Sequence, residues 1–297
     1  MMYTHFMNQK CSLVAIVGPP NAGKSSLLNN WLNKKISIVS SKPHTTRNNV
    51  FGSVTKEDTQ VVFVDTPGFA KKHGVWGKHL QKSMYESLKD VDTILLVIDS
   101  LSPFKLGTEI LFDVAKKTDA NLLVTVHKTD RPKKSKLYEI GRWLKESKSY
   151  EDPIFLTSTN TKTGTEKLLD KIVSLAKEGP WLFDKDQDTN LTKEWIGAEY
   201  VREKVFQSIH QEVPFNIAVQ PTEWDFNSEK WVLRVRLLVR TLSHKKIIIG
   251  KKGFKLQQIG SAARAELMSL WGPGQLFVEV VKDNQFEETI KELYYSS

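Results

Sequence analysis

A segment near the N-terminus combines glycine, lysine and serine at the spacing that phosphate binding requires. It matches the pattern G-x-x-x-x-G-K-[ST] with Gly18, Pro19, Pro20, Asn21, Ala22, Gly23, Lys24 and Ser25. Glycines let backbone amides turn inward on phosphate, lysine neutralises the phosphate charge, and the serine hydroxyl is a ligand for Mg²⁺. The apolar run 13–17 comes directly before the segment, and a helical pattern follows it. The sequence therefore predicts a P-loop between a strand and a helix.

A second, acidic element supplies further groups for phosphate and metal. Asp65, Thr66, Pro67 and Gly68 follow the apolar run 61–64. A carboxylate at that point can reach Mg²⁺ through water, and a glycine amide can meet the γ-phosphate of a nucleotide. In the polar segment 40–49 we predict Thr46, with Thr45 as the alternative, as a hydroxyl that senses the metal. The predicted Mg²⁺ ligands are Ser25, Thr46 and Asp65, and the predicted catalytic residues are Lys24, Thr46 and Gly68.

A third element, His127-Lys128-Thr129-Asp130, follows the apolar run 122–126. It resembles the Asn-Lys-x-Asp motif with which the translation-factor class of GTPases recognises guanine. The resemblance implies that Asp130 accepts hydrogen bonds from guanine N1 and N2 and that the stem of Lys128 covers the base. His127 stands where that class has asparagine, and an imidazole N–H can also donate to guanine N7.

A fourth element, Ser158-Thr159, follows the apolar run 154–156. It resembles the Ser-Ala element of the same class, in which a backbone amide meets guanine O6, and Thr159 keeps that amide. Together the four elements predict GTP and GDP as ligands, with Mg²⁺ as the metal.

The elements that must position these residues are visible as an alternation of short apolar runs and longer amphipathic stretches. The runs are residues 13–17, 61–64, 93–98, 122–126 and 154–156. This alternation is typical of a doubly wound α/β domain. Residues 50–55 are predicted to form a hairpin with 61–64, which adds one antiparallel strand at the sheet edge. We expect a mixed, mostly parallel sheet of about six strands.

The composition changes near residue 180, where Gly179-Pro180 precedes a polar stretch typical of a domain boundary. We predict a GTPase domain over residues 10–180, a linker over 181–194 and a smaller α+β domain over 195–297. The elements expected in the smaller domain are a helix at 195–211, strands at 215–220 and 231–241, a helix at 244–249, a loop at 250–253, a helix at 254–270, a strand at 276–281 and a closing helix.

Positive charge is concentrated in the second predicted domain. Residues 230–264 contain ten lysines and arginines and no aspartate or glutamate, whereas the formal net charge of the whole chain is +9. The loop Gly250-Lys251-Lys252-Gly253 lets a nucleic-acid backbone approach closely. The segment favours single-stranded nucleic acid as the partner, with an anionic membrane surface as the alternative. The predicted contact residues are Lys245, Lys246, Gly250, Lys251, Lys252, Gly253, Lys255 and Arg264.

The order helix, strand, strand, helix, G-x-x-G, helix, strand matches a type II KH domain. Combined with the N-terminal motifs, it makes nearly the whole chain resemble the Era family of ribosome-assembly GTPases. The resemblance implies binding to the 3′ end of small-subunit ribosomal RNA and a role in maturation of the small ribosomal subunit. It also implies a cytoplasmic protein, with peripheral association with the inner face of the cell membrane in some members. We expect a monomer.

Phe69 stands directly after the Asp-x-x-Gly element, where Ras-like enzymes have a glutamine that orients water. A phenyl ring cannot orient water by hydrogen bonding. The same substitution is typical of the Era family, in which Asn21 of the P-loop is associated with a K⁺ ion near the transferred phosphoryl group. The resemblance therefore implies slow intrinsic hydrolysis of GTP, helped by K⁺ or by a partner.

The composition excludes some kinds of site, and the residues that differ from the usual guanine-recognition motifs leave two alternative functions. Cys11 is the only cysteine, so an intrachain disulfide and a cysteine-rich zinc site are excluded, and a reducing compartment is the natural setting. The first alternative is an RNA-binding or membrane-surface scaffold with a weakened, non-hydrolysing nucleotide site, suggested by His127 and Thr159. The second is a related GTPase that acts on the large ribosomal subunit or on transfer RNA.

Overall fold

The computed structural model describes residues 9–38, 50–66, 88–209 and 213–295 of the 297-residue chain. The chain divides into two compact units. The N-terminal unit holds the described residues up to Asn190 except Ile38, and the C-terminal unit holds Ile38 and the described residues from Leu191 onward. Each unit has its own hydrophobic core.

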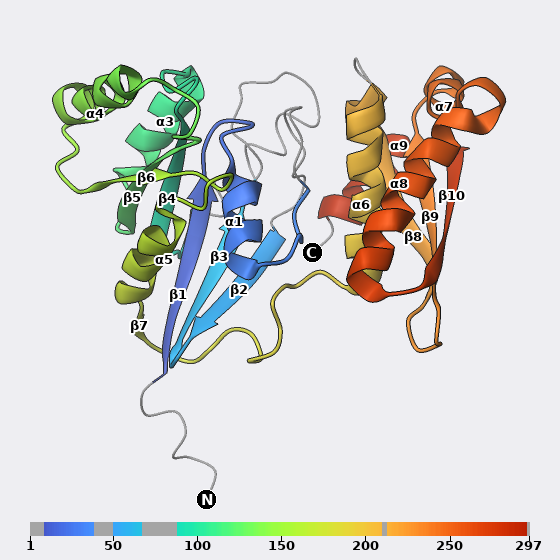
Figure 1. Cartoon of the computed structure of the whole chain (residues 1–297), viewed down its shortest axis with the longest axis horizontal. Coiled ribbons are helices and arrows are strands. Elements are labelled where there is room, and N and C mark those ends of the chain that lie inside the picture. Colours follow the sequence, from blue (N-terminus) through green and yellow to red (C-terminus); the bar gives the residue numbers. More distant parts are fainter. Residues whose placement is uncertain (1–8, 39–49, 67–87, 210–212, 296–297) are drawn as a thin grey trace, which may run out of the picture. The chain divides into compact units, whose positions relative to one another are not determined.

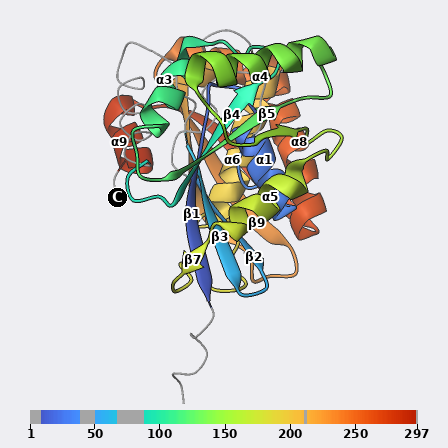
Figure 2. The ribbon, with the colours of Figure 1, turned by 90° about the vertical axis from the view of Figure 1, so that its left-hand side faces the viewer.

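The N-terminal unit is built on a twisted sheet with the strand order β2-β3-β1-β4-β5-β6 (Figure 1). These strands are β1 (Lys10–Val17), β2 (Val50–Lys56), β3 (Thr59–Asp65), β4 (Thr93–Asp99), β5 (Asn121–His127) and β6 (Ile154–Thr157). All neighbours pair in parallel except the β2–β3 hairpin, which confirms the predicted mixed sheet and its antiparallel edge. Figure 2 shows β1, β3 and β2 side by side.

One strand was not predicted. β7 (Lys177–Glu178) pairs antiparallel with the start of β1, which brings the sheet to seven strands within the described residues. Two polar residues carry no period-two apolar pattern, so nothing in the sequence separates them from a loop.

Helices cover both faces of this sheet (Figure 1). One face packs against α1 (Lys24–Leu32) and α5 (Thr165–Ser174), through residues such as Leu28 and Leu168. The other packs against α3 (Leu106–Ala115) and α4 (Lys134–Lys148), through residues such as Phe112 and Leu144. β1, β3, β4 and β5 therefore read as nearly continuous apolar runs, because both of their faces are buried.

The parallel register brings the polar residues at the strand ends together. Asp65 at the end of β3 lies opposite Ile16 of β1. Asp99 at the end of β4 lies opposite His127 of β5, which in turn lies opposite Thr157 of β6. These residues share the carboxyl edge of the sheet, where ligands bind in open α/β folds.

The segment after α5 hydrogen-bonds to the β2–β3 hairpin. The buried Gln60 side chain accepts from the amides of Leu182 and Phe183 at 2.9 and 3.0 Å and donates to the Phe183 carbonyl at 2.9 Å. Farther along, the Ser53 amide donates to the Asp188 carbonyl at 2.8 Å. The predicted linker 181–194 thus begins with residues that belong to the N-terminal unit, and we propose that the domain boundary falls between residues 190 and 191.

The C-terminal unit is a three-stranded sheet, order β10-β9-β8, with α6 and α8 packed on one face (Figure 1). β8 and β9 pair antiparallel, and β9 and β10 pair in parallel, as in a type II KH domain. The elements are α6 (Lys193–Ser208), β8 (Ile217–Asp225), β9 (Trp231–Val239), α7 (Leu242–Ile249), α8 (Phe254–Trp271), β10 (Gly274–Lys282) and α9 (Phe286–Tyr295), with 3₁₀ turns at Val213–Asn216 and Lys251–Gly253.

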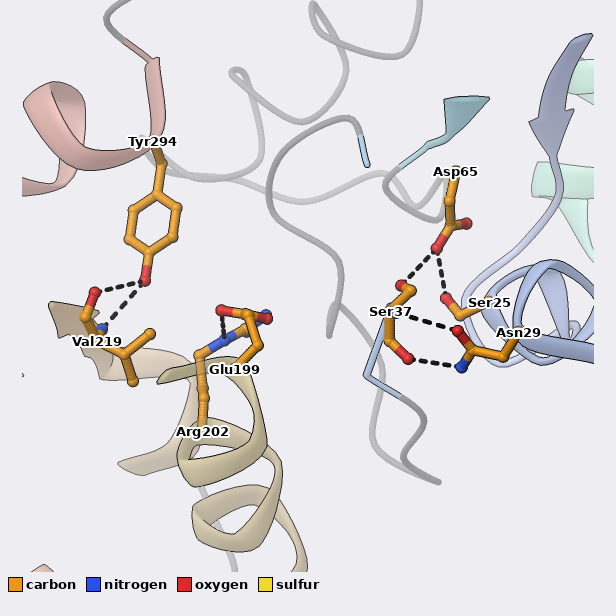
Figure 3. A network of polar contacts seen from close by, with 8 residues as sticks. All are labelled: Ser25, Asn29, Ser37, Asp65, Glu199, Arg202, Val219 and Tyr294. Atoms are coloured by element: carbon orange, nitrogen blue, oxygen red, sulfur yellow. Dashed lines mark hydrogen bonds and ion pairs between the residues drawn. The ribbon is translucent and has the colours of Figure 1, made fainter. Parts of the chain in front are cut away.

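Two polar contacts stabilise this unit (Figure 3). The Tyr294 hydroxyl joins α9 to β8, because it accepts from the Val219 amide at 3.0 Å and donates to the Val219 carbonyl at 3.3 Å. On α6, the buried Arg202 guanidinium donates through Nε to Glu199 Oε1 at 2.8 Å, one turn earlier on the same helix. Burial of a cation is tolerated where a carboxylate of this kind lies beside it.

Alanine substitutions of two glycines in helix interiors distinguish the effect of packing on stability from the effect of helix propensity. A Cβ at Gly197 of α6 would lie 2.4 Å from Leu233 Cδ2 and 3.2 Å from the Trp271 ring, whereas a Cβ at Gly141 of α4 would meet nothing within 4 Å. We expect Gly141→Ala to raise the free energy of unfolding by about 1 kcal/mol. Gly197→Ala should lower it by about 1 kcal/mol, because overpacking outweighs the same propensity gain. Urea titrations followed by circular dichroism measure both, and stabilisation by both substitutions would contradict the tight α6–β9 contact.

Candidate nucleotide-binding site and basic loop

The P-loop lysine is folded back onto its own loop. Lys24 begins α1, only 6% of it is exposed, and its Nζ donates to the carbonyl oxygens of Gly18 and Pro19, each at 3.2 Å. Burial lowers the pKa of Lys24 to about 8; the charge of Asp65 opposes this shift, and the charge of Lys128 adds a smaller contribution in the lowering direction. A buried ammonium that donates to carbonyl oxygens is well placed to exchange them for phosphate oxygens.

A hydroxyl and a carboxylate meet beside the P-loop, as predicted for a Mg²⁺ site. Ser25 Oγ donates to Asp65 Oδ2 at 2.6 Å, and Asp65 is fully buried at the end of β3. Oxygen donors of this kind suit Mg²⁺, which favours one or two protein ligands together with nucleotide phosphates. The neighbouring Thr66 serves the fold, because its hydroxyl donates to the Ile16 carbonyl at 2.8 Å.

Sequence reasoning missed a second hydroxyl at this carboxylate (Figure 3). Ser37 Oγ donates to Asp65 Oδ2 at 2.7 Å. The Asn29 side chain holds the Ser37 backbone on both sides, accepting from its amide at 3.1 Å and donating to its carbonyl at 2.7 Å. The available signal was the spacing of Ser25 and Asn29, which places both on the same face of α1.

The base-recognition carboxylate is oriented by two donors from one loop. Ser158 Oγ donates to Asp130 Oδ1 at 2.6 Å, and Asn160 Nδ2 donates to Asp130 Oδ2 at 3.2 Å. The hydrogen bond from Ser158 is the main cause of a lowered Asp130 pKa. The exposed carboxylate therefore stays ionised as an acceptor. Asn160 was not predicted, and the half-buried Thr159 lies between the two donors in the sequence.

Lys128 joins the base loop to the P-loop. Its backbone is left-handed, with a φ of 62°, and its Nζ donates to the backbone carbonyl of Asn21. It also forms an ion pair with Asp99 Oδ2 at 3.0 Å, while Ser100 Oγ donates to the Lys128 carbonyl at 2.9 Å. Asp99 and Ser100, at the end of β4, are further site residues that the motifs did not identify.

The two remaining residues of this motif point into the sheet. Thr129 donates through its amide and its hydroxyl to the Thr157 carbonyl, at 3.2 and 3.1 Å. His127 is buried, and its Nδ1 lies 2.9 Å from Thr157 Oγ1. A Cβ on Gly23, whose φ is 106°, would lie 2.2 Å from His127 Cδ2 and 2.8 Å from its Nε2. The imidazole thus packs directly against the P-loop.

Four predicted residues of the nucleotide site, Thr46, Pro67, Gly68 and Phe69, lie outside the described residues. The structure brings together the rest of that set at the carboxyl edge of the sheet: the P-loop, Asp65, the motif from His127 to Asp130, and Ser158 with Thr159.

In the C-terminal unit, the loop between α7 and α8 is open and basic. Gly250 and Gly253 have φ values of 72° and 80°, and a Cβ at Gly253 would meet nothing within 4 Å. Lys251 and Lys252 are exposed between them. Within the described parts of the chain, no carboxylate pairs with the predicted lysines Lys245, Lys246, Lys251, Lys252 and Lys255.

The arginines of the basic segment are arranged differently. Those of β9 and its end pair with glutamates from neighbouring elements: Arg234 with Glu223, Arg236 with Glu279 and Arg240 with Glu287. The predicted RNA contact Arg264 donates through Nε to the Gly274 carbonyl at 2.9 Å. The free positive charge is therefore concentrated on the lysines of the loop and its flanking helices.

Asn160 provides a test of how the Asp130 carboxylate is held. We expect Asn160→Ala to weaken GDP binding about three- to tenfold, the contribution of one hydrogen bond, because one carboxylate oxygen loses its donor. Asn121→Ala at the opposite end of β5 is the matched control, since Asn121 Nδ2 donates to the Asp92 carbonyl, away from the base loop. Fluorescence titration with a labelled GDP measures both. Equal affinities for the two variants would show that Asn160 does not orient the base acceptor.

The lowered pKa of Lys24 predicts that the protein takes up protons when it binds a nucleotide. Its pKa in the free protein is about 8. A bound phosphate raises that pKa, so binding at about pH 8 should take up about half a proton, and affinity should fall as the pH rises further. Below that pH the lysine is already charged, and uptake by this group disappears. Calorimetric titrations of GDP in two buffers of different ionisation enthalpy measure the uptake, and identical heats would contradict the lowered pKa.

Comparison with known proteins agrees with this geometry. Residues 13–137 match the family model described as 50S ribosome-binding GTPase. The GTPase Era of Halothermothrix orenii is 34% identical over 97% of this chain and 99% of its own length. That of Clostridium perfringens is 36% identical over 87% of each chain.

Two solved structures are similar over the same extent. One is Era in complex with MgGDPNP and nucleotides 1506–1542 of 16S ribosomal RNA, and the other is a variant of Aquifex aeolicus Era bound to GDP and AlF4⁻. Each has a TM-score of 0.87 and 34% identity, covering 97% of this chain and 99% of the other. The motifs, the two folds and this full-length similarity show that the chain belongs to the Era family of GTPases and hydrolyses GTP with Mg²⁺ as its metal.

Proposed function

We propose that this GTPase binds the 3′ region of small-subunit ribosomal RNA and acts in maturation of the small ribosomal subunit. The observation that carries the proposal is the group of lysines around the Gly250–Gly253 loop, which have no acidic partner among the described residues. Exposed apolar side chains lie beside them, with Ile247 40% and Phe254 61% exposed. Lysines for phosphate and apolar surfaces for bases are the combination that single-stranded RNA requires. The similar Era bound to 16S ribosomal RNA supports the same partner.

Hydrolysis of GTP is proposed to rest on charge placed around the phosphates. Lys24 exchanges its P-loop carbonyls for phosphate oxygens, while Ser25 and Asp65 hold Mg²⁺, which supplies positive charge when bound. Thr46 and the Gly68 amide are proposed to complete this arrangement. Phe69 offers no hydrogen bond to water, so we propose slow turnover stimulated by K⁺ at Asn21 or by a partner.

We further propose that nucleotide state controls RNA binding. Such coupling requires that GTP and GDP make different contacts in two states of the protein. Residues 39–49 and 67–87 connect to Ser37 and Thr66, which the structure anchors beside the nucleotide site. Those anchors give the nucleotide a direct route to both segments, including residues 40–49, which the sequence predicts to close over the nucleotide.

The alternatives of the sequence analysis are weaker. A non-hydrolysing scaffold is set aside, because the chain belongs to a family of GTPases. The second alternative, a GTPase that acts on the large ribosomal subunit, is supported by the family model described as 50S ribosome-binding GTPase. That model matches residues of the N-terminal unit only, whereas the relatives that match over the full chain are named Era. Binding to a membrane surface is a separate outcome of the test below.

No helix among the described residues is long and apolar enough to cross a membrane. We propose that the protein acts in the cytoplasm, in keeping with an RNA partner of this kind, and that it acts as a monomer.

The loop lysines test the RNA proposal. Replacing Lys251 and Lys252 with alanine should weaken binding of an RNA from the 3′ end of small-subunit ribosomal RNA and lower the slope of log affinity against log salt by about 0.7 for each lysine. The matched control is Lys282→Ala, an exposed lysine at the end of β10. Binding is measured by fluorescence anisotropy with GTP-analogue and GDP forms.

Binding to two further ligands, a scrambled RNA and vesicles containing anionic lipid, shows which class of partner the protein prefers. Weaker binding of the scrambled RNA supports the ribosomal target. Binding to vesicles without binding to RNA would overturn the proposal, and equal RNA affinity and orientation in the GTP and GDP forms would remove the proposed coupling.

A further inference from the structure

A chain of three buried polar contacts runs from the interior of the sheet to the nucleotide site. Thr125 of β5 has its Oγ1 3.1 Å from the Phe155 carbonyl and 2.8 Å from Thr157 Oγ1. Thr157 Oγ1 lies 2.9 Å from His127 Nδ1. Thr125 and Thr157 are fully buried, and His127 is 2% exposed. Buried polar groups of this kind are expected to be hydrogen-bonded, so each contact needs one proton.

Counting the protons assigns the donors. The Phe155 carbonyl can only accept, so the Thr125 hydroxyl must donate to it. The Thr157 hydroxyl must then donate to Thr125 Oγ1, because the Thr125 proton is already used. The remaining contact can be made only if His127 carries its proton on Nδ1 and donates to Thr157 Oγ1. The opposite direction leaves the Phe155 carbonyl contact without a proton.

We propose that Thr125, acting through Thr157, holds neutral His127 as the Nδ1–H tautomer, so that this residue presents a hydrogen-bond acceptor, Nε2, towards the P-loop. The ring is neutral near pH 7, because burial, and next the charge of Lys128, lowers the His127 pKa to about 4. The edge that contains Nε2 is the one packed against Gly23. Thr125 and Thr157 are thus positioning residues, and His127 sets the hydrogen-bonding character of this wall of the nucleotide site.

This assignment changes how the site recognises guanine. Guanine N7 and O6 are both acceptors. An acceptor at Nε2 cannot bond to either, in contrast to the N7 contact expected from an imidazole N–H. Selection of guanine then rests on the Asp130 carboxylate with its donors Ser158 and Asn160. The amide of an asparagine at position 127 has two protons, one to donate to Thr157 and one to donate to N7, so His127 weakens nucleotide binding in this chain. The inference concerns the GTPase site alone and is independent of the RNA partner.

Heteronuclear NMR on isotope-labelled histidine tests the tautomer directly, because the two ring nitrogens differ strongly in shift when only one is protonated. The full chain is measured near neutral pH without nucleotide, and His127→Asn identifies the signal among the seven histidines. We expect the Nδ1–H form in the wild type and the Nε2–H form in Thr125→Val, where Thr157 is released to donate to Nδ1. An Nε2–H wild type, or an unchanged tautomer in Thr125→Val, would overturn the proposal.

Affinity for GDP is the second readout. His127→Asn should bind GDP about three- to tenfold more tightly, and Thr125→Val should change affinity in the same direction, because Nε2–H becomes a donor. Thr93→Val is the matched control, since its fully buried hydroxyl in β4 has no hydrogen-bond partner among the described residues. It should leave both the tautomer and the affinity unchanged. Thermal melts show whether each variant is folded, and weaker binding by folded His127→Asn would contradict the proposal.

Discussion

The nucleotide site depends on the parallel register of five strands, β1, β3, β4, β5 and β6. Because their carboxyl ends lie at one edge, residues far apart in the sequence become neighbours. Asp65 lies opposite Ile16 beside the P-loop, and His127 lies between Asp99 and Thr157. A parallel sheet buried on both faces holds this register firmly, since slippage of any strand would expose its apolar residues.

The sheet holds two buried charged groups at the site, and the charges of the ligands are opposite to theirs. Lys24 is buried against carbonyl oxygens, and Asp65 is buried beneath two hydroxyls. Burial of charge is costly, and phosphate and Mg²⁺ would offset that cost at Lys24 and Asp65 when bound. Lys128 has Asp99 as its partner and bonds to Asn21, so the base loop and the P-loop are linked directly.

The basic residues of the C-terminal unit fall into two groups that differ in whether they form ion pairs. Arginines of the sheet are neutralised by glutamates from adjacent elements, whereas the lysines around the Gly250–Gly253 loop pair with no carboxylate in the part of the chain that the structure describes. Arg234 also lies over the Phe277 ring at 4.3 Å, which gives it a role in packing. Charge that remains exposed beside a glycine-rich loop is available to a phosphate backbone. The charge count of a segment is therefore a poor guide to which cations can bind a ligand.

Motifs with fixed spacing could be identified from the sequence, because the P-loop, the Asp65 element and the motif ending at Asp130 are each local. Apolar runs likewise predicted the strands and helices of both units, although β7 had no pattern to reveal it. The residues that orient these motifs could not be predicted. Ser37, Asn160 and Thr125 act on partners 28 to 32 positions away. The sequence by itself determined the family chemistry, whereas the tertiary structure decided which hydroxyls and amides face the reactive groups, because only the register of the strands and the packing of the loops and helix around them bring those distant residues within hydrogen-bonding distance.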